Sequence, residues 1–405
     1  MVFSSMEFLC IFLPSVLLLN FIIKEKYSNI LLLGFSLLFY YIGEPEYIFF
    51  FLGFMLINYV LAILIDYTTG IRKKSIFWMT IILDLGFLFY YKYSGFFVET
   101  IGNLGITFEN PEFFKNIIMP IGISFFTFQT LSYIADLYMG KVSVQKNPLK
   151  LCLYVSLFPQ LIAGPIVKYK EIDTELCKRR ISSNDIHYGI QRFCIGLGKK
   201  VIIANQAAVI ADIVFSYDPS VVNTFDLWIG MFAYTLQIYF DFSGYSDMAI
   251  GIGRILGFHF MENFNYPYIS KSIQEFWRRW HISLSTFFKE YLYIPLGGNR
   301  KGVYRTYINN LIVFALCGFW HGAEWTFLIW GLYHGFFIII EKFNTIKNIK
   351  KKLPEYVNFA VTFFIVMFGW VFFRAENAQY GLKYIRNLMP NISSGGGHTY
   401  PLQHI

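Results

Sequence analysis

Charged side chains are scarce in this chain. Only 15% of its 405 residues are Asp, Glu, Lys or Arg, whereas 56% are hydrophobic and 20% are aromatic. A soluble globular protein carries about 25% charged residues. Apolar runs of about 15 to 20 residues recur from one end of the chain to the other, which is typical of membrane-spanning helices. We therefore expect an all-α, polytopic transmembrane helical bundle that forms one membrane-embedded domain over residues 1–405.

Several common functional signatures are also missing. The five cysteines, at positions 10, 152, 177, 194 and 317, show neither paired nor metal-like spacing, so we expect free thiols. No G-x-S-x-G motif is present, which argues against a serine triad. The net charge of +8 comes without a basic, water-soluble domain, which argues against nucleic-acid binding. The first apolar run has no basic segment before it and no cleavage site after it, so we expect it to be retained as a span.

The basic residues lie in short loops between the apolar runs and predict the orientation of the chain. Lys24 and Lys26 follow the first run, Arg72–Lys74 follow the third, and Lys271–Arg305 is the most basic stretch of all. Loops of this kind stay on the cytoplasmic side. Their alternation along the chain predicts about ten spans, with the N-terminus outside.

One apolar run, Leu149–Val167, does not fit that alternation. Basic residues flank it on both sides, so a single crossing would place one basic flank outside. Pro159, Gly164 and Pro165 break helices within it. We expect a re-entrant or broken segment that enters from the cytoplasm and is covered by protein.

Two carboxylates fall inside another apolar run, YFDFSGYSDMAIG, which covers Tyr239–Gly251. A carboxylate at membrane depth is a candidate functional group. The alternative is that Asp241 and Asp247 are structural partners for arginine or for backbone amides. The small residues between them indicate tight packing and local hydrogen bonds, which favours the structural interpretation.

The first of two unusual histidines lies in QEFWRRWHISLSTFFKEYLYIPLGGNR, Gln274–Arg300. The apolar positions of this stretch share one face of a helix that is expected to begin near Lys271, with Ser270 as its cap. His281 falls at the edge of that face, while Arg278 points away from it. A boundary histidine bonded to a backbone carbonyl is the alternative to a functional role.

The second unusual histidine, His321, lies in CGFWHGAEWTFLIWGLYHG, Cys317–Gly335. The preceding helix is too short to cross a bilayer, so we expect His321 and Gly322 to interrupt it at membrane depth. No second ligand stands at a metal-binding spacing, and Cys317 is expected to be an apolar filler. His334 is expected to be structural or interfacial. The remaining interpretation of His321 is a buried, neutral general base.

These stretches resemble a known family. RRWHISLSTFFKEYLYIPLGGNR, Arg278–Arg300, and GFWHGAEWTFLIWGLYHG, Gly318–Gly335, are similar to the membrane-bound O-acyltransferase family, above all to its alginate O-acetyltransferase branch. QLIAGPIVKY, Gln160–Tyr169, QIYFDFSGYSDMAIG, Gln237–Gly251, and the opening MVFSS match the same branch. Members are often longer at the C-terminus, so a final helix is expected to be absent or the chain to be truncated.

The resemblance implies a multi-pass enzyme of the bacterial cytoplasmic membrane. It would move an acyl group, expected to be acetyl, from a cytoplasmic thioester, acetyl-CoA or an acyl carrier, to a hydroxyl outside. The acceptor would be an extracytoplasmic polysaccharide or a partner acetyltransferase. No bound cofactor, metal or nucleic acid is expected, and membrane lipid surrounds the chain.

The resemblance also implies roles for individual residues. His321 matches the presumed catalytic histidine, and His281 matches the second motif histidine. We expect an internal acyl-transfer tunnel that Asp241 and Trp320 help to line. Arg278 and Arg279 could hold the phosphates of the donor at its inner mouth. Positive-inside anchoring is the alternative for both arginines.

Two other functions stay open at this point. A transporter could use His281, His321 and Asp241 as a proton relay. A scaffold could recruit an external acetyltransferase without any chemistry of its own. The glycines beside His321, and the lack of a ladder of carboxylates, favour the enzyme.

Overall fold

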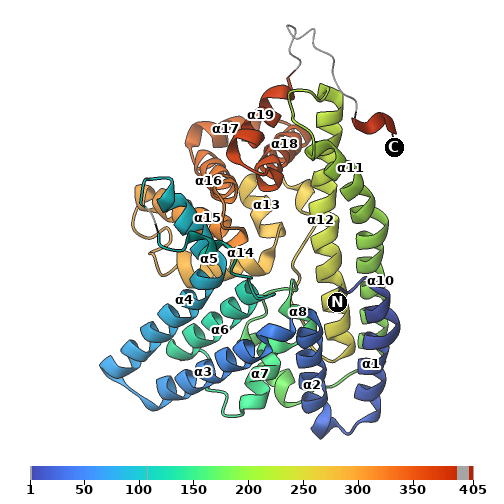
Figure 1. Ribbon diagram of the computed structural model, residues 1–405, viewed down its shortest axis with the longest axis vertical. Helices are drawn as coiled ribbons and strands as arrows, with labels where there is room; N and C mark the ends of the chain where they lie inside the picture. The colour runs from blue at the N-terminus through green and yellow to red at the C-terminus, as the bar shows by residue number, and fades with distance from the viewer. Residues whose placement is uncertain (1, 107, 390–400, 405) are drawn as a thin grey trace. The chain divides into compact units, whose positions relative to one another are not determined.

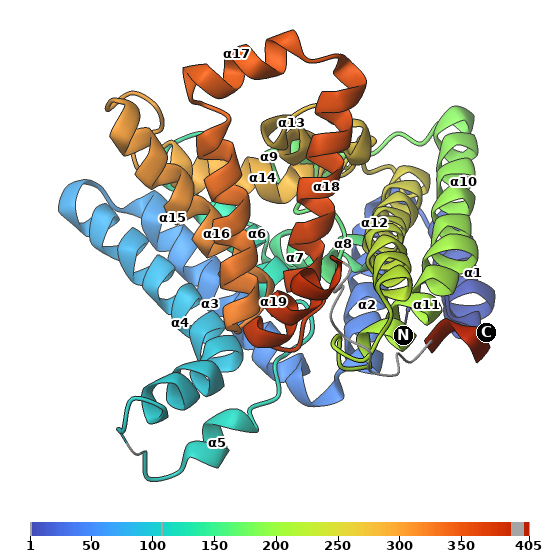
Figure 2. The same cartoon turned by 90° about the horizontal axis from the view of Figure 1, so that it is seen from above.

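The computed structural model describes residues 2–106, 108–389 and 401–404, and its fold is all-helical, as expected (Figures 1 and 2). No β-strand forms within these ranges. The described chain divides into two compact units. Unit 1 comprises Met1–Leu197 and Tyr245–Glu262, and unit 2 comprises Gly198–Gly244 and Asn263–Ile405. The long helix α12, Thr224–Ile255, contributes to both.

Unit 1 is built from the N-terminal helices and the last turns of α12. Its elements are η1 (Phe8–Phe12), α1 (Leu13–Ile22), α2 (Glu25–Gly43), η2 (Pro45–Tyr47), α3 (Ile48–Tyr67), α4 (Gly70–Gly102), α5 (Pro111–Lys115), α6 (Ile123–Tyr138), α7 (Pro148–Ser156), α8 (Phe158–Leu161), α9 (Tyr169–Cys177) and α10 (Ser183–Gly198). Figures 1 and 2 both show α3 and α4 side by side. A cluster of aromatic rings fills part of the core, with Phe3, Phe8, Phe39 and Phe158 fully or almost fully buried.

Unit 2 contains both histidine stretches. Its elements are η3 (Lys199–Ala204), α11 (Asn205–Phe215), the first turns of α12, η4 (Pro267–Ile269), α13 (Ile273–Arg279), α14 (Ile282–Phe288), η5 (Lys289–Tyr293), α15 (Val303–His321), α16 (Trp325–Ile340), α17 (Asn344–Lys352), α18 (Glu355–Arg374), α19 (Ala378–Asn387) and η6 (Pro401–His404). Helices α15 and α16 lie side by side in both views.

Some helices have the length and composition of membrane spans. Four do so singly: Pro45–Tyr67, Gly70–Gly102, Ser183–Phe215 and Glu355–Arg374. Trp325–Ile340 and Asn344–Lys352, bent by 79° at their junction, would make a fifth as one broken span. Many large apolar side chains on these helices point outward, such as Phe49 and Ile82. A helix that is hydrophobic on every side suits a membrane. The larger number of about ten spans, and the single-domain organisation, stay predictions.

The segment Leu149–Val167 is broken, as its prolines predict. It forms the short helices α7 and α8, which meet at Leu157. Their inner positions are buried, and Gln160 is 0% exposed. The bond from Phe158 N–H to Ser36 Oγ, 3.2 Å, fixes the break against α2. The segment is therefore covered by protein, which non-helical backbone in a membrane requires.

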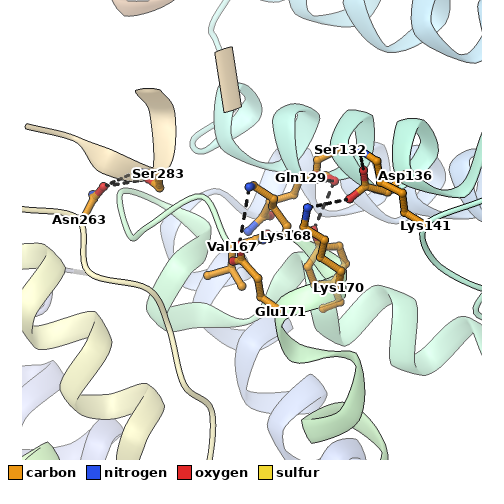
Figure 3. Close-up of polar contacts among 11 residues, drawn as sticks. Gln129, Ser132, Asp136, Lys141, Val167, Lys168, Lys170, Glu171, Asn263 and Ser283 are labelled. Atoms are coloured by element: carbon orange, nitrogen blue, oxygen red, sulfur yellow. Dashed lines mark hydrogen bonds and ion pairs between the residues drawn. The ribbon is translucent and has the colours of Figure 1, made fainter. Parts of the chain in front are cut away.

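Buried charges in unit 1 are paired close to this segment (Figure 3). Asp136, 1% exposed, lies 3.2 Å from the Nζ atom of Lys141 and 3.9 Å from that of Lys170. Lys168 is also buried and lies 3.8 Å from Glu171. The pairing compensates part of the cost of removing these charges from water.

Glycines allow α15 and α16 to approach closely. A Cβ atom at Gly318 would lie 2.2 Å from the carbonyl oxygen of Phe327, and one at Gly331 would lie 2.2 Å from that of Phe314. Gly322, which caps α15, is covered by the Phe327 ring. Small residues permit such backbone contact between helices. The contact fixes the end of α15, where His321 lies.

Candidate active site

The helix predicted from Lys271 is interrupted at the first histidine. Helix α13 ends at Arg279 and α14 begins at Ile282, so the expectation of one continuous amphipathic helix is wrong. The N-cap also lies two residues after the predicted one, Ser270. The hydroxyl of Ser272 accepts the Glu275 N–H at 3.0 Å, whereas Ser270 donates to the carbonyl of Pro267.

His281 itself makes the break, because its φ angle is +44°. Such a conformation is uncommon for a residue with a Cβ atom and persists only when its surroundings impose it. The surroundings here are two backbone hydrogen bonds. Asn265 N–H donates to Arg279, and Ile282 N–H donates to Asn263, each at 2.9 Å.

Asn263 fixes the ring of His281. Its Oδ1 atom accepts the Ser283 N–H at 3.2 Å and the Ser283 hydroxyl at 2.9 Å, and lies 3.2 Å from His281 Nδ1 (Figure 3 shows Asn263 and Ser283). The Ser283 backbone donor requires an oxygen at this position, so the amide orientation follows from the network. His281 therefore carries its proton on Nδ1 and presents the lone pair of Nε2.

The environment of His281 keeps it neutral. The residue is 0% exposed and lies between α13 and α14, outside the helices that could span a membrane. Burial lowers the pKa of His281 to about 3, because an imidazolium loses its hydration there. Among the described residues, Nε2 has no hydrogen-bond partner. A neutral imidazole with an unused lone pair can accept a proton or a hydrogen bond.

His321 lies beside His281 at the last position of α15. The two ring centroids are 6.4 Å apart, so the structure brings the two motif histidines together. The expected interruption at His321 and Gly322 is confirmed, because Gly322 is the C-cap of the helix. The depth of this position in a membrane stays a prediction. The side chain of His321 is partly exposed, in contrast to that of His281.

Aromatic rings surround His321. Trp320, Trp330 and Phe373 have ring centroids 4.9, 5.1 and 5.2 Å from its own. Trp320 also lies 6.0 Å from His281 and thus contacts both histidines. The tunnel that Trp320 was predicted to line stays a prediction. These rings make the surroundings of His321 largely apolar.

The third histidine of unit 2, His334, is fully buried, which suits the structural expectation and not the interfacial one. Its ring lies 5.3 Å from Trp277 and 5.2 Å from Trp330. Cys317 is also buried in α15, 4% exposed, as an apolar filler would be.

The two predicted donor-binding arginines differ. Arg279 donates to Glu275 at 2.9 Å and to the carbonyl of Asn265 at 3.2 Å, so it stabilises the bend before α14. Arg278 is exposed and forms no ion pair within the described ranges. Donor binding by either residue stays a prediction, and Arg278 is the one whose guanidinium is free of a structural ion pair.

The two carboxylates that were predicted to lie at membrane depth each have a basic partner. In unit 1, Asp247 lies 2.8 Å from Arg192, which also contacts Glu262. In unit 2, Asp241 lies 2.6 Å from Lys200 and its side chain is 44% exposed. The structural interpretation is therefore confirmed for Asp247. The tunnel position of Asp241 stays a prediction.

Sequence reasoning missed Asn263, Ser283 and the basic partners of the carboxylates. Asn263 lies 18 residues before His281, in a segment without periodic apolar residues. Arg192 lies 55 residues before Asp247. No local pattern links residues that far apart, although ENFNYP is a polar interruption next to a histidine motif and could have directed attention to Asn263.

Comparison with known proteins supports the family resemblance of the two histidine motifs. A family model described as the membrane-bound O-acyltransferase family, MBOAT, matches residues 143–375. The probable alginate O-acetylase AlgI of Pseudomonas aeruginosa is 43% identical over 383 residues, which cover 94% of this chain and 73% of that protein. The chain belongs to the membrane-bound O-acyltransferase family.

More distant members of the family are similar over large parts of the chain. The peptidoglycan O-acetyltransferase of Helicobacter pylori is 36% identical over 426 residues, covering 96% of this chain and 80% of that protein. The teichoic acid D-alanyltransferase of Bacillus subtilis is 31% identical over 284 residues, covering 64% of this chain and 70% of that protein. This chain is thus a membrane protein and an O-acyltransferase.

Proposed function

We propose that this enzyme moves an acetyl group from a cytoplasmic thioester to a hydroxyl of an extracytoplasmic polysaccharide, in the cytoplasmic membrane of a bacterium. The observation that carries the proposal is the pair His281 and His321, whose rings lie 6.4 Å apart within an aromatic surround. The relatives named as alginate and peptidoglycan O-acetyltransferases support acetyl as the group and a polysaccharide as the acceptor.

His321 is the general base in this proposal. Its imidazole takes the proton of the acceptor hydroxyl while the hydroxyl oxygen attacks the thioester carbonyl. The partial exposure of His321 leaves it reachable by both substrates. The surrounding tryptophans exclude water, which would otherwise hydrolyse the thioester.

His281 positions the donor. Its Nδ1 proton is engaged by Asn263, so Nε2 can accept a hydrogen bond from an amide N–H of a pantetheine arm or from the acceptor hydroxyl. Arg278 is proposed to contact the phosphates of acetyl-CoA or of an acyl carrier, since an exposed guanidinium matches phosphate oxygens.

Orientation follows the loop charges. The N-terminus is proposed to lie outside, and Lys271–Arg305 inside. Cysteines placed at Ser4 and at Asn299 are then labelled from opposite sides of the membrane by an impermeant thiol reagent. Labelling of both from one side contradicts the orientation.

The proposed activity is tested on cells. Envelope glycans are isolated from otherwise identical cells with and without the protein, and ester-linked acetyl groups are measured by mass spectrometry. We expect acetyl esters that depend on the protein and disappear on mild alkaline treatment. Esters of another acyl group would correct the donor, and an unchanged glycan profile would contradict the proposed acceptor.

A further inference from the structure

Two buried indole N–H groups next to the histidines have no acceptor among the described residues. They belong to Trp277 in α13, 6% exposed, and Trp330 in α16, 0% exposed. Two other tryptophans of unit 2, Trp370 and Trp228, differ. Trp370 donates to the hydroxyl of Tyr268 at 3.0 Å, and Trp228 donates to the carbonyl of Leu388 at 3.0 Å. A buried donor without an acceptor destabilises the fold, and phenylalanine would fill the same apolar place without that cost.

The two unused donors lie in one cluster with the catalytic pair. The Trp330 ring lies 5.1 Å from that of His321 and 5.6 Å from that of Trp277. The ring of His334 contacts both tryptophans, and neither of its nitrogens has a partner in the part of the chain that the structure describes. Unused hydrogen-bonding atoms are therefore concentrated within two ring contacts of His321, with Trp330 in direct contact and Trp277 and His334 packed against Trp330.

An indole nitrogen can only donate, so its missing partner must be an acceptor. The reaction at His321 creates such an acceptor transiently. When the hydroxyl oxygen bonds to the thioester carbon, the carbonyl electron pair moves to the carbonyl oxygen and makes it an oxyanion. The strongest demand for donors thus arises in the transition state.

We propose that the N–H groups of Trp330 and Trp277 stabilise this oxyanion, an inference that rests on the proposed acyl transfer. His321 takes the hydroxyl proton as the carbon–oxygen bond forms. The oxyanion then collapses, the carbon–sulfur bond breaks, and the leaving thiolate takes the proton from His321. Fixed donors in a water-poor site are effective because they need no reorganisation when the charge appears.

Substitutions that remove an N–H and keep an aromatic ring test the proposal. Trp330→Phe and Trp277→Phe are compared with Trp370→Phe, the matched control whose N–H already has a protein acceptor. The enzyme is assayed in membrane vesicles that contain the host's envelope glycan, with [14C]acetyl-CoA as the donor. Initial rates of label transfer to glycan give kcat and KM for the donor.

We expect Trp330→Phe to lower kcat by about 100-fold, with little change in KM, since loss of one oxyanion donor has that size of effect. Trp277→Phe is expected to act in the same direction. Trp370→Phe is expected to keep kcat, although its midpoint of thermal unfolding falls. Wild-type kcat in both Trp330→Phe and Trp277→Phe overturns the proposal.

Loss of folding in a phenylalanine variant is separated from loss of the donor by benzothienylalanine. This residue has the shape of tryptophan but carries sulfur where the indole has N–H. Placed at position 330, it is expected to leave the thermal midpoint intact and to reproduce the fall in kcat. An active benzothienylalanine enzyme overturns the proposal. If the wild-type enzyme transfers no label, the proposed donor or acceptor is wrong. The tryptophan variants are then compared with the wild-type enzyme on the corrected substrate.

Discussion

The segment around Asp247 and the segment around His281 are both polar interruptions of strongly apolar sequence, but their polar atoms are satisfied differently. Asp247 is paired with Arg192 at 2.8 Å, and Arg192 also reaches Glu262. His281 is held by Asn263 through one nitrogen, and its other nitrogen has no partner within the described residues. The carboxylate of Asp247 is thus paired within the protein, whereas Nε2 of His281 can still form a hydrogen bond to a substrate.

This difference separates structural polar groups from functional ones in a membrane protein. Burial alone does not, because both groups are buried: Asp247 is 5% exposed and His281 is 0% exposed. What distinguishes them is a buried hydrogen-bonding atom, Nε2 of His281, that has no partner among the described residues. Leaving such an atom unsatisfied destabilises the fold, so its presence near His321 calls for a functional explanation.

The largest expected effect follows from removing the base. His321→Ala should lower acyl transfer by about 10² to 10⁴, because a general base contributes that much to the rate. The variant should remain folded and inserted. Transfer of [14C]acetyl to glycan in vesicles with equal amounts of protein measures the effect, and His281→Ala is expected to fall less. A wild-type rate for His321→Ala would leave the scaffold function as the better explanation.

Acidification is expected to destabilise the protein through His281. Its pKa is about 3 when folded and 6.5 ordinarily, so the unfolded chain binds a proton first. The stability is complete above about pH 6.5 and is lost progressively as the pH falls from there toward 3. The midpoint of thermal unfolding of the detergent-solubilised protein, measured at pH 7.5, 6 and 5, gives the slope of stability against pH. His281→Gln should show a smaller slope, and an equal slope would contradict this assignment.

Loss of the Asn263 hydrogen bond that orients His281 should lower activity less than loss of His321 does. Asn263→Ala removes the acceptor for both Ser283 and His281 Nδ1, and a fall in kcat of about 10-fold is expected, as for other residues that orient a functional histidine. Asn263→Asp keeps the acceptor oxygen and should restore most of the rate. If Asp fails to rescue while the fold is intact, the hydrogen bond is not what Asn263 contributes.

The smallest effect on acyl transfer is expected at the two carboxylates that are paired with a basic residue, Asp247 with Arg192 and Asp241 with Lys200. Arg192→Met leaves Asp247 without its cation and should lower the free energy of unfolding by about 1 to 3 kcal/mol, with unchanged kcat per folded molecule. Lys200→Met is the matched control. Its partner Asp241 is 44% exposed, so the loss should stay below about 1 kcal/mol. Urea titrations compare the two, and a reversed order would show that exposure does not govern these pairs.

Much of this arrangement could be predicted from local sequence. Apolar length and scarce charge gave the helical membrane class, the prolines gave the break between α7 and α8, and the glycine after His321 gave the end of α15. Each of these depends on residues next to one another in the chain, where turn and helix chemistry act directly.

The break at His281 could not be predicted in this way. The apolar period continues through Trp277, Trp280 and Leu284, so the local pattern favours one helix. The φ of +44° is imposed from outside the helix, by bonds to Asn263 and Asn265. Contacts between distant parts of the chain override the local preference, and the partners of Asp241 and Asp247 were missed for the same reason.

The start of α13 depends on a residue made much later. The carboxylate of Glu341 accepts the N–H groups of Ile273 and Gln274, 68 and 67 positions earlier, at 2.9 and 3.1 Å. Helix starts carry free donors that such a carboxylate satisfies. A growing chain on the ribosome therefore holds α13 without this cap until Glu341 has been synthesised. The hydrogen bonds at the start of the helix that leads to His281 are therefore complete only after the chain has been synthesised through the end of α16.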